Sequence, residues 1–127
     1  MGTTYFSDSE LASKDTGTYI LADGFGKRLD ELREAIGRPL YLNSAARSKS
    51  HNKTVGGHAK SLHVYDDPYH PTGGCCAVDI RCLDAEFRAD IVHAALSYGF
   101  SCGIAKTFVH VDDRTRILGF PQVVYTY

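Results

Sequence analysis

The stretch Cys76-Ala-Val-Asp-Ile-Arg-Cys82 decides how this chain folds. Cysteine, valine and isoleucine occupy every second position, and this period of two is typical of a β-strand with one buried face. Val78 and Ile80 therefore share the buried face, and Asp79 between them points to the opposite side. The stretch predicts a strand that presents a carboxylate away from the core.

A second stretch, Thr107-Phe-Val-His-Val-Asp112, alternates in the same way. Its two valines face one side, and Phe108, His110 and Asp112 face the other. Two strands thus each present ionisable side chains on the face opposite their apolar neighbours. This arrangement predicts that the polar side chains of both strands serve a common site.

Two helices accompany these strands. Between residues 25 and 36 apolar side chains recur at helical spacing, and Gly37 is a suitable stop. Asp84 is a good N-cap for a second helix, whose apolar stripe runs from Phe87 to Tyr98. We therefore predict one helix before the first strand and another directly after it.

Helices and strands do not alternate regularly along the chain. Further short strands are predicted at residues 39–43 and 122–127. We therefore predict an α+β fold, a mainly antiparallel sheet flanked by helices. A chain of this length fits one domain, residues 1–127, with an irregular lead-in at 1–24 and a polar loop at 44–74 that contains one helical turn.

Composition excludes several classes of protein. The formal net charge is −1 and the basic residues form no dense block, so nothing indicates a nucleic-acid partner. The apolar runs are too short for a membrane span. The first residues lack the basic and apolar regions of a secretory signal, so we expect no signal peptide in this chain.

The four cysteines lie at positions 75, 76, 82 and 102 and form no Cys-x-x-Cys pair. A cysteine zinc knuckle is therefore not expected. Buried thiols are the favoured interpretation. A single bridge between Cys102 and another cysteine stays open.

One set of side chains has the composition of a catalytic zinc site. Asp79 and His110 come from the two alternating strands, and His63 lies in the polar loop before the first strand. Two imidazoles and one carboxylate can hold Zn²⁺ and leave a fourth position for water. Zinc lowers the pKa of such a water and polarises a carbonyl, which suits amide hydrolysis.

Further motifs make this pattern more specific. In chain order they are Ser44-Ala-Ala-Arg47, Ser61-Leu-His63, Ala77-Val-Asp79-Ile80 and Phe108-Val-His-Val-Asp112. In order and spacing they resemble the zinc D-Ala-D-Ala carboxypeptidase family, which is grouped with the lysostaphin-type peptidases and the hedgehog signalling domain. The resemblance covers nearly the whole chain and implies a hedgehog-like or DD-peptidase-like fold.

The resemblance also implies roles for individual residues. His63, Asp79 and His110 match the zinc ligands of the family. Arg47 matches an arginine near the substrate, where a guanidinium could hold a peptide carboxylate by two parallel hydrogen bonds. Ser61 matches a serine that could contact the substrate or brace a ligand.

The chain departs from the family pattern between its first two ligands. His63 and Asp79 are sixteen positions apart, much farther than the family usually places them. The insert, residues 64–74, is tolerable because the entropy of loop closure grows slowly with length. We expect this insert near the site, as a lip over the cleft or as a decorative loop. His70 within it is a rival ligand to His63.

A second departure concerns the general base. Many relatives carry an acid at the position of Thr107, which cannot take a proton in this way. Asp112 shares the face of His110 and is our candidate base, although it could equally orient that histidine. The rival candidates are His51, His58 and Asp66.

The implied activity is zinc-dependent hydrolysis of an amide bond in peptidoglycan stem peptides, by a carboxypeptidase or an endolysin-like endopeptidase. We expect a monomer that acts on the bacterial cell wall, in the periplasm, outside the cell or delivered by a phage. An alternative is a zinc-containing module of the same fold that binds cell wall or a protein without cutting it. A cysteine-based enzyme is disfavoured, because no cysteine lies in a convincing Cys/His setting.

Overall fold

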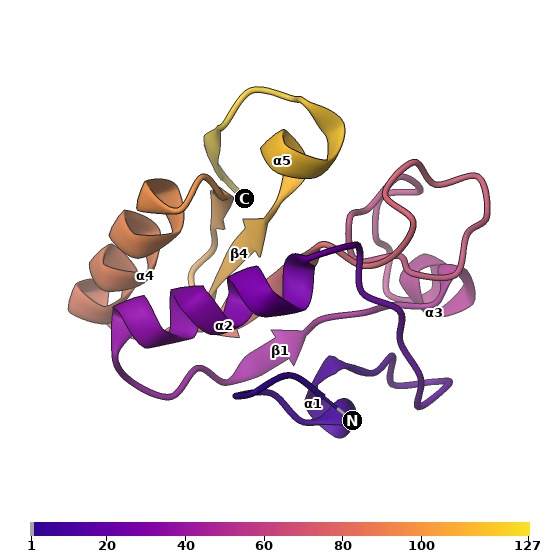
Figure 1. Ribbon diagram of the computed structural model, residues 1–127, viewed down its shortest axis with the longest axis horizontal. Coiled ribbons are helices and arrows are strands. Elements are labelled where there is room, and N and C mark those ends of the chain that lie inside the picture. The colour runs from indigo at the N-terminus through magenta and orange to yellow at the C-terminus, as the bar shows by residue number, and fades with distance from the viewer. Residues whose placement is uncertain (1) are drawn as a thin grey trace.

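The computed structural model describes residues 2–127 and contains a five-stranded sheet with helices on both sides (Figure 1). The elements in chain order are α1 (Asp8–Leu11), α2 (Phe25–Ile36), β1 (Leu42–Ser44), α3 (Lys49–Thr54), β2 (Ala77–Arg81), α4 (Ala85–Ser97), β3 (Ser101–Ile104), β4 (Phe108–Asp112), α5 (Arg114–Leu118) and β5 (Val124–Thr126).

The sheet has the strand order β1-β2-β4-β3-β5. Three of its four strand pairs are antiparallel, and the last, β3 with β5, is parallel. This architecture confirms the predicted α+β class and the mainly antiparallel sheet. The two alternating stretches that were recognised in the sequence, β2 and β4, lie side by side at its centre.

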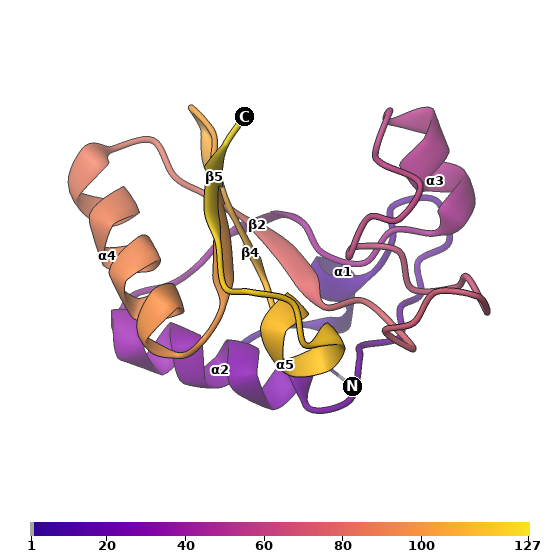
Figure 2. The same cartoon turned by 90° about the horizontal axis from the view of Figure 1, so that it is seen from above.

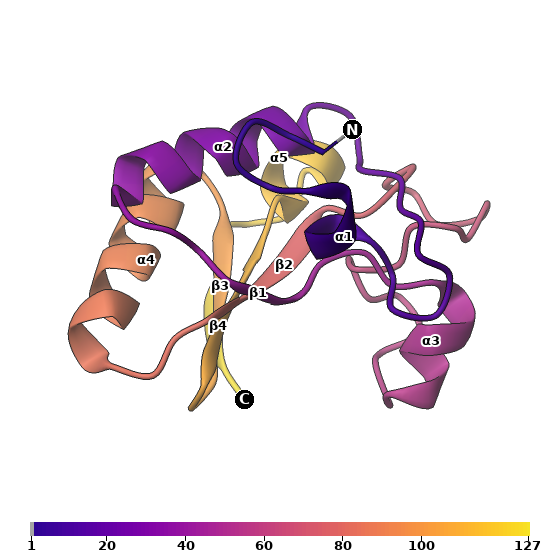
Figure 3. The same cartoon turned by 90° about the horizontal axis from the view of Figure 1, so that it is seen from below.

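Helices α2 and α4 cover one face of the sheet, and Figures 2 and 3 show α3 and the long loop beside it on the other. The predicted apolar alternation places Val78, Ile80, Val109 and Val111 on the helix-covered face, where each is fully buried. Burial of such side chains contributes about 1.5–3 kcal/mol each. They belong to one core cluster with apolar residues of α2 and α4, among them Phe25, Leu29, Leu32, Phe87, Ile91 and Ala95.

Local signals set the helix boundaries. The Asp84 carboxylate accepts a hydrogen bond from the Phe87 N–H at 2.7 Å, which confirms the predicted N-cap of α4. Helix α2 ends at Gly37, whose positive φ of 78° is one that glycine adopts without strain. Both predicted helices are therefore confirmed.

Three elements were not predicted, and one strand is shifted. Helix α1 interrupts the lead-in, where the Ser7 hydroxyl and the Glu10 carboxylate form a capping box. Strand β3 and helix α5 are also new, since four or five residues are too few for a clear period. Strand β1 covers Leu42–Ser44 rather than 39–43, and the predicted strand in the tail is confirmed as β5.

The four cysteines are free thiols, and all are buried. Burial raises the pKa of Cys75 and of Cys102 to about 12, so neither is a reactive thiolate near neutral pH. The interpretation as buried thiols is confirmed. Within residues 2–127, the structure has no helix of the length and apolar character needed to cross a membrane.

Candidate metal centre

Strand pairing brings two of the predicted ligands together. Asp79 on β2 lies directly opposite His110 on β4, so both side chains leave the sheet on the face that α2 and α4 do not cover. His63 reaches them from the loop that precedes β2. All three residues are buried, with exposed fractions of 3–6%.

The His63 ring is oriented by its backbone surroundings. Its Nδ1–H donates a hydrogen bond to the Ala45 carbonyl oxygen at 2.6 Å. This bond assigns the proton to Nδ1 and leaves a lone pair on Nε2, which lies 3.2 Å from Asp79 Oδ1. The nitrogen that faces the cluster is therefore an acceptor.

His110 is oriented in the same manner by a carboxylate. Its Nε2–H donates to Asp112 Oδ2 at 2.7 Å, and its Nδ1 lies 3.1 Å from Asp79 Oδ1. The rings of His63 and His110 meet edge to face at 5.2 Å. Both imidazoles thus turn an unprotonated nitrogen toward the same carboxylate oxygen.

This donor set fits a cation. Two imidazole lone pairs and one carboxylate oxygen converge, and the ligand atoms of the three residues all lie within 4.8 Å of one another. Three acceptors in contact repel unless a proton or a metal ion lies between them. Two histidines and one carboxylate are a usual catalytic zinc set. In each histidine the ring N–H group that points away from the cluster already donates a hydrogen bond, as is usual for zinc ligands.

The three residues of the cluster alter one another's pKa values. Burial raises the pKa of Asp79, but its close contacts with His110 and His63 outweigh that effect and hold the pKa well below its usual range. Burial lowers the pKa of His63 and outweighs its contacts with Asp79. Burial lowers the pKa of His110, but its contacts with Asp112 and Asp79 exceed that effect, and the pKa is raised.

Asp112 lies behind His110 and is fully buried. Its Oδ1 accepts from the backbone N–H and the Nε of Arg114, and its Oδ2 accepts from Arg114 Nη2 and from His110. Burial raises its pKa, but these hydrogen bonds prevail and lower it to about 2. Both carboxylate oxygens are engaged, so Asp112 orients His110 rather than facing the open side of the cluster.

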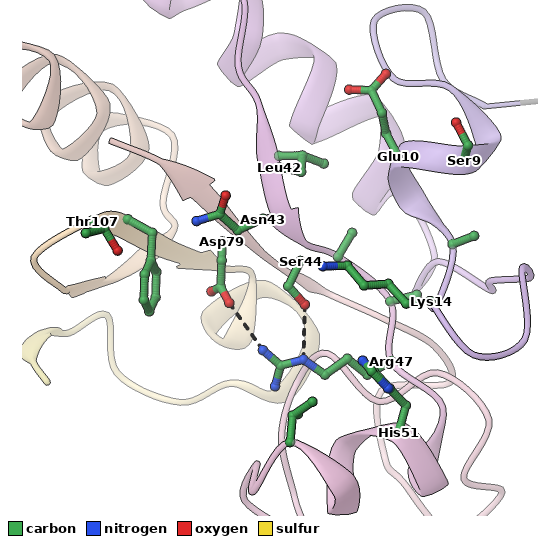
Figure 4. Close-up of a pocket in the computed structure, with 15 residues that line it drawn as sticks. Ser9, Glu10, Lys14, Leu42, Asn43, Ser44, Arg47, His51, Asp79 and Thr107 are labelled. Atoms are coloured by element: carbon green, nitrogen blue, oxygen red, sulfur yellow. Dashed lines mark hydrogen bonds and ion pairs between the residues drawn. The ribbon is translucent and has the colours of Figure 1, made fainter. Parts of the chain in front are cut away.

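Arg47 points toward Asp79, and both residues line an open groove (Figure 4). Its Nη2 donates to Asp79 Oδ2 at 3.2 Å, its Nε to Ser44 at 3.0 Å and its Nη1 to Asn52 at 3.3 Å. The groove has a volume of about 490 Å³ and is lined by residues of α1, β1, α3, β2 and β4, including Glu10, Asn43, Arg47, His51, Asp79 and Phe108.

Comparison with known protein families agrees with this geometry. The family model described as Peptidase M15 matches residues 7–112, which is most of the chain. The chain belongs to the peptidase M15 family. Searches of curated proteins and of solved structures find no match.

Membership in the M15 family confirms the resemblance to zinc D-Ala-D-Ala carboxypeptidases. The family is zinc-dependent, and the matched segment contains the whole His63, Asp79 and His110 cluster. The match ends at Asp112, so α5 and β5 lie beyond it. The protein is therefore a member of a peptidase family with a cluster that could bind a metal ion.

The insert between His63 and Asp79, residues 64–74, does not line the groove described above. Asp66 accepts a hydrogen bond from the Lys49 N–H at 2.7 Å, and Asp67 pairs with the Lys49 ammonium at 3.9 Å. His70 contacts the carbonyl oxygens of Lys60 and Ser61 and is not part of the metal cluster. The insert packs against the start of α3 and braces the segment that carries Arg47.

The remaining candidates are distributed unevenly around the site. The Ser61 hydroxyl accepts from the His63 N–H at 3.3 Å and so contacts the backbone of a cluster residue. Of the rival bases, His51 lines the groove, whereas His58 Nδ1 accepts from the Lys60 N–H and Asp66 is engaged at α3.

Sequence reasoning missed the partners that hold these side chains in place. Arg114 fixes Asp112, and Asn52 joins Arg47 to the His58 carbonyl through its amide. Arg114 had a weak signal, because it stands two residues after Asp112. Asn52 had none, because its two partners come from different parts of an irregular loop.

Proposed function

We propose that this protein hydrolyses an amide bond in peptidoglycan stem peptides and that His63 Nε2, the Asp79 carboxylate and His110 Nδ1 hold zinc for this reaction. The observation that carries the proposal is the convergence of the three acceptors, with both outer imidazole N–H groups already bound. Bound zinc supplies an activated water and a polarised carbonyl.

Arg47 is proposed to bind the substrate. A guanidinium has five N–H groups, and hydrogen bonds to Ser44, Asn52 and Asp79 engage three of them. Its side chain is 18% exposed and lines the groove, so the other N–H groups can reach a peptide carboxylate. Stem peptides offer such carboxylates, and a charge-assisted pair would orient the amide beside the cluster.

Asp112 and Ser61 are proposed to act through the ligands. The Asp112 carboxylate holds the His110 ring in one tautomer and direction, which supports a positioning role better than that of a general base. Ser61 holds the backbone of His63, which supports bracing rather than substrate contact. His51, which lines the groove, is the best placed of the rival bases.

The site is complete within one chain, which supports a monomer as the active form. If the protein cuts stem peptides, it acts at the bacterial cell wall. We further propose that residues 1–127 act as one zinc peptidase domain.

The test is mass spectrometry of purified peptidoglycan after incubation with the protein, with and without a zinc chelator. New peptide fragments that vanish with chelator and return with added zinc are the expected result. Their masses would distinguish removal of a terminal D-Ala from cleavage within a stem or crosslink. Fragments that persist in chelator would contradict the proposal.

One observation favours a second candidate, a wall-binding module that does not cut. Among the residues that line the groove, the carboxylates are Glu10, which caps α1, and Asp79, which belongs to the cluster. Neither is free to act as a base. Co-sedimentation of the zinc-loaded protein with peptidoglycan, without any fragments, would support this candidate.

A further inference from the structure

Strand β5 brings two tyrosines to the face of the sheet that carries the cluster. Gly103 on β3 pairs with His110 on one side and with Tyr125 on the other. Asp79, His110, Gly103 and Tyr125 therefore form one row across the sheet, with their side-chain positions on the same face. Tyr127 follows on this face two residues later.

Gly103 allows the Tyr125 ring to lie across the sheet toward His110. A Cβ atom at position 103 would be 2.6 Å from two ring carbons of Tyr125 and 2.7 Å from its hydroxyl oxygen. With glycine there, the Tyr125 ring extends over β3, and its centroid lies 6.0 Å from that of His110. The Tyr125 phenol thus fills the space that a side chain at position 103 would occupy.

Tyr127 extends this aromatic surface to the groove. Its ring packs against Tyr125 at 5.7 Å and, edge to face, against Phe108 at 5.1 Å. Phe108 lines the groove together with Asp79 and Arg47. Tyr127 does not itself line the groove, but it is 69% exposed beside Phe108, where a ligand that extends past Phe108 would meet it.

The two phenol rings lie next to each other, tilted by 44°. Burial raises the pKa of Tyr125 and of Tyr127 above the usual value. Both phenols therefore keep their protons near neutral pH, and each can donate a hydrogen bond. The Tyr127 hydroxyl also lies within electrostatic range of Asp79 and Arg47, whose charges act on it in opposite directions.

We propose that the Tyr127 hydroxyl donates a hydrogen bond to the carbonyl oxygen of the scissile amide and that Tyr125 positions it. The inference rests on the proposed function and adds a catalytic residue outside the segment that the family model matches. Packing against Tyr125 and Phe108 fixes the direction of the Tyr127 ring and so positions its hydroxyl. The bond strengthens as negative charge develops on the carbonyl oxygen, which lowers the barrier.

Kinetics of three phenylalanine variants test this role. Loss of a donor to a developing oxyanion typically lowers kcat by about 10²–10³-fold, so we expect a fall of that size in Tyr127→Phe with KM within about threefold. Tyr125→Phe should lose less, and the double variant should be no slower than Tyr127→Phe alone, because both act through one hydroxyl. Tyr98→Phe, at the end of α4, is the control and should match the wild type.

A binding measurement gives a readout that does not need turnover. The probe is a phosphinate analogue of D-alanyl-D-alanine, whose tetrahedral oxygens replace the scissile carbonyl. We expect Tyr127→Phe to bind it at least about tenfold more weakly than the wild type, with the zinc content unchanged.

The outcomes separate the two proposals. A wild type that cuts stem peptides, beside a Tyr127→Phe variant that keeps kcat and phosphinate affinity within about threefold, would overturn the role of Tyr127 alone. A zinc-loaded wild type that neither cuts the peptides nor binds the phosphinate would overturn the proposed function, and the role of Tyr127 with it.

Discussion

The candidate site has two halves that are built differently. Asp79 and His110 belong to paired central strands, where hydrogen bonds to neighbouring strands hold the backbone on both sides. His63 and Arg47 belong to the irregular segment between β1 and β2, where single polar contacts hold the backbone. The sheet's backbone hydrogen bonds hold the strand half in place. The loop half instead depends on each of its individual contacts.

The contacts of the loop half reach far along the chain. The Arg47 N–H donates to the His63 carbonyl, and the Tyr65 N–H donates to the Arg47 carbonyl. The Asp15 carboxylate accepts from the hydroxyl of Ser48, the N-cap of α3. The comparison teaches that a ligand on a strand needs few supporting side chains, whereas a ligand on a loop needs several, and these can be removed one at a time.

The largest loss of bound zinc and of activity is expected when a ligand of the cluster, where the two halves meet, is removed. His63→Ala and His110→Ala should each abolish activity and lose bound zinc, because two protein ligands hold the ion poorly. Asp79→Ala should do the same. Zinc content by plasma mass spectrometry and turnover of stem peptides are the measurements, with His93→Ala, on the exposed face of α4, as the control. Full zinc and activity in either histidine variant would remove that residue from the ligand set.

The next largest effect is a loss of zinc affinity in the strand half, where two adjacent buried carboxylates have different partners. Asp112 binds His110 and Arg114, whereas Asp113 binds Arg28 and Arg116. Asp112→Asn should lower zinc affinity about 10–100-fold, because the support of a ligand is lost.

Asp113→Asn is the matched control for that variant. It should cost about 1–3 kcal/mol of unfolding free energy, because its arginine partners lose a charged acceptor. Its zinc affinity should stay near that of the wild type. Competition with a chromophoric chelator and urea unfolding measure the two quantities. Equal zinc affinities in both variants would mean that Asp112 does not support His110 in the way described.

A smaller effect tests the loop half. Asn52 is 3% exposed, and its amide donates to the His58 carbonyl at 2.8 Å. Asn52→Ala should cost about 1–3 kcal/mol and expose amides of the segment from β1 to β2 to faster hydrogen exchange. Amides of β2 and β4 should keep their protection. Thr54→Ala, on the exposed side of α3, is the control. Uniform loss of protection in loop and strands would contradict the division into two halves.

The smallest effect is a pH dependence at the base of the loop half. Hydrogen bonds from Ser13 and Ser48 hold the pKa of Asp15 below its usual range. Its stabilising effect is therefore present above the pKa of the unfolded chain, about 3.9, and is lost as the pH falls through the lower folded pKa. Asp15→Asn should lower the Tm at pH 7, and the difference from wild type should shrink toward pH 3. A difference that does not change with pH would contradict this origin.

The strand half could be predicted from the sequence almost completely. Alternation around Asp79 and His110 indicates which face each side chain takes, and the apolar stripe of α2 predicts where that helix begins and ends. These signals are local and repeat along the chain, so a single sequence contains them.

The rest could not be predicted, because it depends on residues that are distant in the chain. His63 stood out from the other histidines only through resemblance to a family. Strand β3 is short and contains Gly103, whose lack of a side chain is explained only by Tyr125 on another strand. The insert packs against α3, a contact that no periodicity indicates.

The central claim is that one zinc ion joins the two halves. A crystal structure of the zinc-loaded protein, with anomalous data on both sides of the zinc absorption edge, tests it most directly. The account predicts a single anomalous peak bound by His63 Nε2, the Asp79 carboxylate and His110 Nδ1, with Arg47 beside it. A zinc peak on the cysteines or on His51 and His58, or no zinc between His63 and His110, would contradict it.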